Sequence, residues 1–232
     1  MRKYLDKIAP RSFAVVKPVK IIIENVAEDY DEVFQAPVFP TVKDSPTYDL
    51  HATKAIYIDA DDFSEKDVAG FFGVMPSNIV RLRYCFYIRL KEVVRTPGGE
   101  LKHVVVERVD EEPAKKVKGF IHWVSEKHSL PCELRMYDYL FTEKLPEKEA
   151  AEQKVDWINY VNQHSESIHK GCLVHAGVRG AQVQTHFQFE RMGYFVVDYD
   201  TDASKGKYVF NMTVGLRESG EKAKVLQKMR KA

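Results

Sequence analysis

Two arginines and one glutamine occupy positions where strand periodicity would place planar side chains on the face of a sheet. Arg81 and Arg83 alternate with apolar residues within the stretch 79–90, a period of two that predicts a half-buried antiparallel strand. Gln188 stands between two phenylalanines, so it faces outward if those rings face the core. Guanidinium and amide groups can pair with the edges of nucleobases. The alternative is that each residue simply belongs to the solvated face of a strand.

His122 and His128 are the residues whose types first suggest catalysis. Sequence spacing places no nucleophile or carboxylate beside either of them, so we expect structural histidines and no catalytic residue. The three cysteines are far apart and none forms a Cys-x-x-Cys pair, which favours neither a zinc site nor a disulfide framework. Thiols of this kind suit a reducing compartment, as small buried hydrophobes. We therefore expect no metal and no cofactor in this chain.

Composition predicts a folded chain without a membrane span. The 232 residues are 44% hydrophobic and 12% aromatic, enough for one large or two small domains. Neither a run of about 18 apolar residues nor an apolar signal segment is present. The formal charge of +1 does not by itself indicate nucleic-acid binding, so an RNA site has to be a local basic surface. Residues 1–11 and 217–232 hold such local excesses of positive charge.

Most apolar stretches have the β-branched composition or the period of two that predicts strands. A turn at 96–99 joins the strand 79–90 to a return strand, so the two form a hairpin. Many short strands with few helices predict an all-β fold of barrels or sandwiches. The expected strands are 13–16, 19–23, 55–58, 79–90, 101–109, 117–124, 133–139, 187–189, 194–198 and 207–216, the expected helices are 64–73, 147–162 and 221–231, and the expected loops are 37–48 and 198–207.

Seven segments resemble, in the same order, the C-terminal region of the glutaminyl-tRNA synthetase family. The segment 187–195, Phe-Gln-Phe-Glu-Arg-x-Gly-Tyr-Phe, separates this family from the related eukaryotic-type glutamyl-tRNA synthetases. The resemblance runs from about residue 9 to residue 217. The segments are 9–11, 16–25, 79–83, 118–125, 133–141, 187–195 and 209–216.

The resemblance implies two β-barrels of the ribosomal-protein-L25-like type with a few short helices. Residues 1–8 would end a helical link from a catalytic half, 9–115 would form the first barrel region, 116–217 the second, and 218–232 a basic tail. The C-terminal part of the second region would return to the first barrel. The catalytic half, with its His-Ile-Gly-His-like and Lys-Met-Ser-Lys-like motifs, its ATP and its Mg, is missing from this chain. The resemblance therefore implies that this chain is a fragment of a ligase of this family and is inactive alone.

The resemblance also implies a binding site for the anticodon loop of glutamine tRNA. Arg11 and Gln188 match the family residues that contact the middle anticodon uridine, and Arg81 matches an arginine beside the first base. Arg83 shares the strand face of Arg81. Two further RNA-binding candidates are Arg191 and Lys20. Arg11 and Gln188 can serve one base only if the end of the chain returns to its start.

Because of two departures from the family pattern, the residue that recognises the third anticodon base is not identified. Residues 71–74 read Phe-Phe-Gly-Val where the bacterial form has a basic pair, and Met212 replaces an arginine.

The expected partners are glutamine tRNA and the catalytic domain of the same protein, without DNA or membrane, in a cytoplasmic monomer. The alternatives are an L25-like module for ribosomal RNA or for protein partners, a glutamyl-tRNA synthetase domain, and a free-standing hydrolase using His122 or His128.

Overall fold

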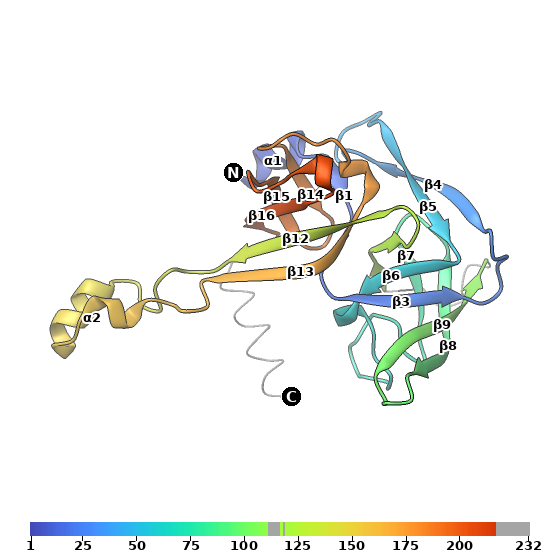
Figure 1. The fold of residues 1–232 in the computed structure, drawn as a ribbon, viewed down its shortest axis with the longest axis horizontal. Helices are drawn as coiled ribbons and strands as arrows, with labels where there is room; N and C mark the ends of the chain where they lie inside the picture. Colours follow the sequence, from blue (N-terminus) through green and yellow to red (C-terminus); the bar gives the residue numbers. More distant parts are fainter. Residues whose placement is uncertain (111–116, 118, 217–232) are drawn as a thin grey trace.

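Strands dominate the structure, a computed structural model that describes residues 1–110, 117 and 119–216 (Figure 1). The helices are α1 (Arg2–Ile8) and α2 (Pro146–Gln153), with short 3-10 helices η1 (Ala60–Asp62), η2 (Trp157–Tyr160), η3 (Ala176–Val178) and η4 (Ala203–Lys205). The strands are β1 (Arg11–Ser12), β2 (Ala14–Val15), β3 (Pro18–Ile23), β4 (Asp31–Pro37), β5 (Thr47–Thr53), β6 (Ala55–Asp59), β7 (Ile79–Leu82), β8 (Tyr87–Arg95), β9 (Leu101–Val109), β10 (Phe120–Ile121), β11 (Trp123–Ser125), β12 (Ser129–Tyr137), β13 (Glu166–His175), β14 (His186–Phe189), β15 (Gly193–Val197) and β16 (Tyr208–Gly215).

The strands form two seven-stranded, barrel-like sheets and one separate hairpin. The first sheet has the order β10-β7-β8-β9-β3-β6-β11, and the second has the order β1-β14-β15-β16-β12-β13-β2. β4 and β5 pair only with each other. The expectation of an all-β fold with two barrel-like sheets is confirmed. Within the described ranges, no helix is both long and apolar enough to cross a membrane.

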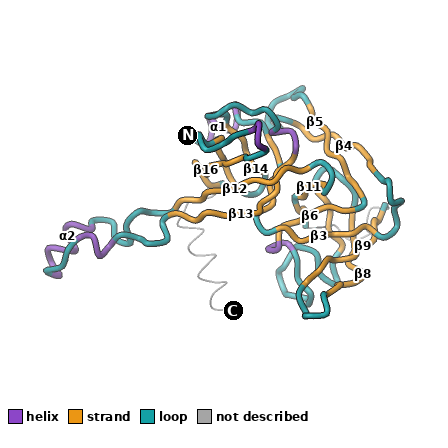
Figure 2. Tube along the Cα trace, viewed as in Figure 1, coloured by secondary structure: helices purple, strands orange, loops and turns teal. Residues whose placement is uncertain are grey.

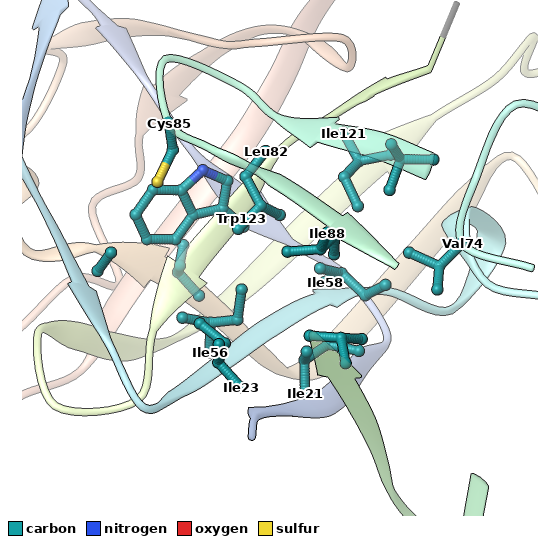
Figure 3. Close-up of a cluster of buried hydrophobic side chains, with 14 of the residues drawn as sticks. Ile21, Ile23, Ile56, Ile58, Val74, Leu82, Cys85, Ile88, Ile121 and Trp123 are labelled. Carbon is teal, nitrogen blue, oxygen red and sulfur yellow. The ribbon is translucent and has the colours of Figure 1, made fainter. Parts of the chain in front are cut away.

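The first sheet closes around branched aliphatic side chains and one tryptophan (Figure 3). Along β3 every second residue from Val19 to Ile23 is buried, as its period of two predicts. Trp123 is 1% exposed and donates from Nε1 to the carbonyl oxygen of Arg83 at 3.1 Å. Its ring is therefore part of the core, with its polar atom satisfied.

The second sheet has an aromatic core. Phe189 lies at its centre, with its ring centroid 4.8 Å from that of Phe195 and 5.1 Å from that of Phe210. Phe187 stacks beside Phe189 and meets Phe210 edge to face. Tilted and edge-to-face contacts of this kind are favourable for aromatic rings. They hold the backbone of β14 in place, and with it Gln188.

The two sheets exchange segments. β1 and β2 precede β3 in the chain but join the second sheet, whereas β10 and β11 follow β9 and join the first. β1 lies parallel to β14, and β2 lies antiparallel to β13. The division of the chain into 9–115 and 116–217 stays a prediction about domains, because each sheet takes strands from both sides of residue 115.

The expected continuous strand over 79–90 is wrong, because a tight turn divides it into β7 and β8. The turn is closed by a hydrogen bond from Cys85 N to Leu82 O (2.8 Å) and one from Leu82 N to Phe86 O (3.0 Å). Tyr84 takes a positive φ of 61° within it. β7 then pairs with β8, and β8 pairs with β9 in the hairpin that the 96–99 turn predicted.

The helix expected over 64–73 is also wrong. Ser64 donates to the carbonyl oxygen of Val74, and Phe63 forms a β-bridge with Val74. These cross-links close 64–73 as a loop, so tertiary contacts override the local capping pattern. The helix expected over 147–162 is half right. α2 ends where Lys154 adopts a left-handed conformation, and η2 follows.

The β12–β13 ribbon projects from the barrels and ends in α2 (Figure 2). β13 has a polar outer half and was not expected, and neither were the arms of the β4–β5 hairpin. The expected loops 37–48 and 198–207 are largely confirmed. The expected helix 221–231, the tail 218–232 and residue 118 of the expected strand 117–124 lie outside the described residues.

Candidate functional site

Arg11 and Gln188 are direct partners in the parallel ladder between β1 and β14. Gln188 N donates to Pro10 O at 2.9 Å, and Glu190 N donates to Ser12 O at 3.1 Å, which fixes this register. Both residues are only 8% exposed. The expectation that the two residues converge is confirmed. The expectation that Gln188 faces outward from its phenylalanine neighbours is wrong, because all three are buried.

Arg11 is oriented by Asp6 of helix α1. Nη2 of Arg11 donates to Oδ1 of Asp6 at 2.5 Å. The same carboxylate accepts from the hydroxyls of Thr41 and Tyr194, each at 3.3 Å. The hydrogen bond from Arg11 is the largest cause of a lowered Asp6 pKa, and it outweighs the opposing effect of burial. Asp6 is therefore ionised at neutral pH and pins one end of the guanidinium.

The other end of the guanidinium is buried and unpaired in the described part of the chain. Nη1 of Arg11 and Oε1 of Gln188 are buried atoms without a hydrogen-bond partner among the described residues. A buried polar atom in that position costs about 1–3 kcal/mol, so each one requires a physical explanation. One is a donor and the other an acceptor, on directly paired residues. Together they can serve a planar ligand that carries an acceptor next to a donor.

Tyr48 on β5 belongs to the same neighbourhood and was not expected from the sequence. Its hydroxyl is a further buried atom without a partner in the described part of the chain. Burial, and then the negative charge of Glu190, raises its pKa, while the charges of Arg83 and Arg11 oppose that rise. The residue lies at the edge of the proline-bounded stretch expected as a loop. No local sequence signal therefore marked it.

Glu190 ties the second sheet to the first. It is 4% exposed and accepts hydrogen bonds from Arg83 Nε and from the hydroxyl of Tyr84, the latter at 2.9 Å. The Arg83 guanidinium also lies 4.7 Å from the centre of the Tyr84 ring. Burial disfavours the Arg83 cation, but the Glu190 carboxylate outweighs it and raises the pKa of Arg83. Arg83 is thus held near Tyr48 and is 34% exposed.

Arg191 bridges the sheets a second time. Its Nη1 and Nη2 donate to the two carboxylate oxygens of Asp62 at 2.5 and 2.7 Å, a bidentate pair. Its Nη1 also lies 3.0 Å from His122 Nδ1. Burial and the Arg191 charge lower the pKa of His122 to about 4. His122 is therefore neutral at pH 7 and accepts from Arg191, a structural role that agrees with expectation.

Arg81 and Lys20 are not brought to the Arg11–Gln188 pair by any hydrogen bond. Arg81 Nε donates to Cys85 O at 3.1 Å, and its guanidinium lies 5.4 Å from the centre of the Tyr87 ring. Lys20 pairs with Glu126 at 2.6 Å, beside a separate surface cavity of the first sheet. The three cysteines are free and buried, as expected.

The fold and this site define an anticodon-binding domain. A family profile described as "tRNA synthetases class I (E and Q), anti-codon binding domain" matches residues 9–109. A second profile with the same description matches residues 120–198. Together the matches cover most of the chain, which belongs to this family, and the family resemblance of its segments is confirmed.

The relatives reported below are glutamine–tRNA ligases, which favours the glutamine enzymes over the glutamate enzymes of this family. The chain is 37% identical to the glutamine–tRNA ligase of Pseudomonas aeruginosa over 227 residues, which is 94% of this chain and 40% of the relative. It is 36% identical to that of Ralstonia pickettii over 94% of this chain and 38% of the relative. It is 34% identical to the probable glutamine–tRNA ligase of Dictyostelium discoideum, over 96% of this chain and 28% of the relative. The chain thus spans 40% or less of these relatives.

Proposed function

We propose that this chain reads the anticodon loop of glutamine tRNA for a glutamine–tRNA ligase. The observation that carries the proposal is the strand pairing of Arg11 with Gln188, which leaves one donor and one acceptor on these two residues without a hydrogen-bond partner. Anticodon bases are single-stranded and can be turned out of the loop, so their Watson–Crick edges are available to side chains. A rigid pair on two hydrogen-bonded strands suits such an edge.

The middle uridine of the CUG and UUG anticodons fits the two open atoms. Uracil presents an N3–H donor beside carbonyl acceptors. Oε1 of Gln188 would accept from N3–H, and Nη1 of Arg11 would donate to a carbonyl oxygen. Cytosine presents an acceptor at N3 and an amino group beside it, so the same two protein atoms would face like partners. Leaving buried polar groups unpaired in this way is the physical source of discrimination.

The other basic residues have supporting parts in this proposal. Arg81 would contact the first anticodon base, and its ring contact with Tyr87 steadies the guanidinium. Arg83 would present its exposed edge to the same loop, while Glu190 fixes its orientation. Arg191 and Lys20 are already in ion pairs, so we expect them to contribute phosphate contacts of smaller effect.

A titration with anticodon stem-loops tests this proposal. A loop with CUG should bind more tightly than one with CCG, by about 1–3 kcal/mol, and this difference should shrink in Arg11→Ala and in Gln188→Ala. Lys148→Ala, on the projecting arm, is the matched control and should leave the difference intact. Equal affinity for all middle bases, or a preference for a ribosomal RNA fragment, would overturn the proposal.

The wider role also belongs to this proposal. The catalytic domain of the full ligase would use ATP and Mg to attach glutamine, and no residue of this chain takes part in that chemistry. The chain would act in the cytoplasm, as part of a monomer. Its contribution is selection of the tRNA, which predicts that charging of glutamine tRNA falls when Arg11 or Gln188 is changed in the full protein.

A further inference from the structure

Two histidines and one aspartate from three separate segments meet at one point. Asp31 is the first residue of β4, and His51 lies on β5. The third, His128, lies in the turn between β11 and β12. Their ligand atoms all lie within 4.8 Å of one another, and this is the one such group of three found in the described part of the chain. None of the three residues belongs to the proposed RNA site.

The backbone brings the three side chains together for local reasons. In the β4–β5 ladder Asp31 pairs with Thr53 and Val33 pairs with His51, so Asp31 and His51 are diagonal neighbours on one face. The β11–β12 turn is fastened to the same place. The hydroxyls of Thr53 and Ser125 are 2.8 Å apart, and Ser125 Oγ accepts from the backbone N–H of His128.

Both imidazole rings are within hydrogen-bond distance of the same carboxylate. Nδ1 of His51 lies 2.7 Å from Oδ1 of Asp31, and Nε2 of His128 lies 2.8 Å from Oδ2. The two rings are stacked with centroids 4.1 Å apart and 23° between their planes. Lys127 also donates to Oδ2. These donors, Lys127 first, hold the pKa of Asp31 well below its ordinary range, so its carboxylate is ionised.

We propose that Asp31, His51 and His128 bind a divalent transition-metal ion, zinc or one with similar ligand preferences. Two imidazole nitrogens and a carboxylate oxygen form a usual zinc set, with a fourth position left for water. The side chains are 22–29% exposed, so that position is open to solvent. The expectation of a chain without metal rested on cysteine spacing, which gives no information about two histidines and an aspartate.

Small movements suffice for binding. Around a tetrahedral zinc ion, ligand atoms stand about 3.3 Å apart, so the pairs now at hydrogen-bond distance must separate by roughly half an ångström. The two rings must turn so that their lone pairs converge, and each proton facing Asp31 must leave or move to the far ring nitrogen. Lys127 must release Asp31, at little cost because its side chain is 67% exposed.

A bound ion would clamp the β4–β5 hairpin to the β11–β12 turn. This hairpin carries Tyr48 and, in the loop between its strands, Val38, whose carbonyl oxygen accepts from Arg11 N at 2.9 Å. Metal binding should therefore raise the thermal midpoint of the chain. The inference does not depend on the RNA proposal, because it is read from metal binding alone.

The test uses the untagged full chain after treatment with a chelator. We expect one Zn²⁺ per chain by calorimetry, and one Co²⁺ with the visible absorption of a tetrahedral site. His51→Ala and His128→Ala should each weaken Zn²⁺ binding at least about tenfold, the effect that even outer-shell changes produce. The matched control, His164→Ala, changes an exposed histidine of the projecting arm and should have no effect.

Two further variants separate metal binding from loss of folding. Asp31→Asn keeps the size of the side chain but removes its charge, and it should weaken Zn²⁺ binding while the chain still unfolds cooperatively without metal. Lys127→Ala removes the competing cation and should strengthen binding. Absence of stoichiometric binding, or binding that is unchanged in His51→Ala, His128→Ala and Asp31→Asn, would overturn the proposal.

Discussion

Asp6 and Arg11 are joined by a hydrogen bond of 2.5 Å between Oδ1 and Nη2, across the short segment that links α1 to β1. The other terminal nitrogen, Nη1 of Arg11, is buried without a hydrogen-bond partner among the described residues. A guanidinium reads a base only when its plane is fixed, so Asp6 is a positioning residue in the proposed site. Its effect should appear in selectivity rather than in overall affinity.

The variant Asp6→Asn tests this role. It removes a negative charge next to RNA, so binding of any stem-loop at low salt should strengthen slightly. The ratio of affinities for CUG and CCG loops should fall, because Arg11 is no longer anchored. Fluorescence titrations of the two loops at two salt concentrations measure both effects. An unchanged ratio would mean that Asp6 does not position Arg11 for base recognition.

Asp6 also predicts a pH dependence of folding. Its pKa in the folded chain lies below the ordinary value of 3.8. Its stabilising effect is therefore fully present above that value and is lost as pH falls through the lower folded pKa. Acid unfolding should therefore begin at a higher pH in Asp6→Asn than in wild type. Asp44→Asn, at an exposed position, is the control and should unfold as wild type does.

Tyr48→Phe separates stability from binding. The hydroxyl of Tyr48 is buried without a partner among the described residues, so removing it should leave the free energy of unfolding unchanged or raise it by about 1 kcal/mol. If the hydroxyl contacts the bound loop, affinity should fall in the same variant. Denaturant unfolding and stem-loop titration measure the two quantities. A destabilised Tyr48→Phe with normal RNA binding would assign the hydroxyl to the fold alone.

Glu190→Gln tests the tie between the two sheets. Arg83 and Tyr84 would lose a charged acceptor from a side chain that is 5% exposed, which should lower the free energy of unfolding on the order of 2 kcal/mol. Glu100→Gln, in the exposed turn after β8, is the matched control and should stay within about 0.5 kcal/mol of wild type. Denaturant unfolding followed by tryptophan fluorescence reports on this directly, because Trp123 donates to Arg83 O. Equal midpoints for both variants would show that the ion pair is dispensable.

The sequence predicted the class of fold and the convergence of Arg11 and Gln188, but not the geometry around them. Strand content follows from the period of two, and convergence followed from the order of the family segments. The turn at Tyr84 was hidden because apolar alternation continues through it, without the glycine or proline that usually marks a turn. Its positive φ is stabilised by tertiary contacts that local patterns do not contain.

The ion-pair partners that join the two sheets could not be predicted from the sequence either. Arg191, named from the sequence as an RNA-binding candidate, forms its ion pair with Asp62, and its neighbour Glu190 forms one with Arg83. A sequence supplies the charges but not the register that selects among them. Four of the five basic residues predicted for the site meet a carboxylate, namely Arg11, Arg83, Arg191 and Lys20. We therefore expect these four to contact RNA through the donor atoms left over.

His122 predicts how stability responds to mild acid. Its folded pKa of about 4 lies below the 6.5 of an unperturbed histidine, so the unfolded chain binds the proton first as pH falls. Stability should therefore decline from about pH 6.5 to about pH 4, by up to about 1.4 kcal/mol per pH unit for this one group. His175, with its pKa also lowered to about 4 by burial, adds a decline of the same sign.

His122→Gln should flatten this decline, because the glutamine oxygen can still accept from Arg191 but does not titrate. Denaturant unfolding measured from about pH 7 to about pH 4 gives the slope for each protein. His164→Gln, at an exposed site, should leave the wild-type slope unchanged. Parallel curves for wild type and His122→Gln would show that folding does not lower the pKa of His122, and that its contact with Arg191 is not the acceptor bond described here.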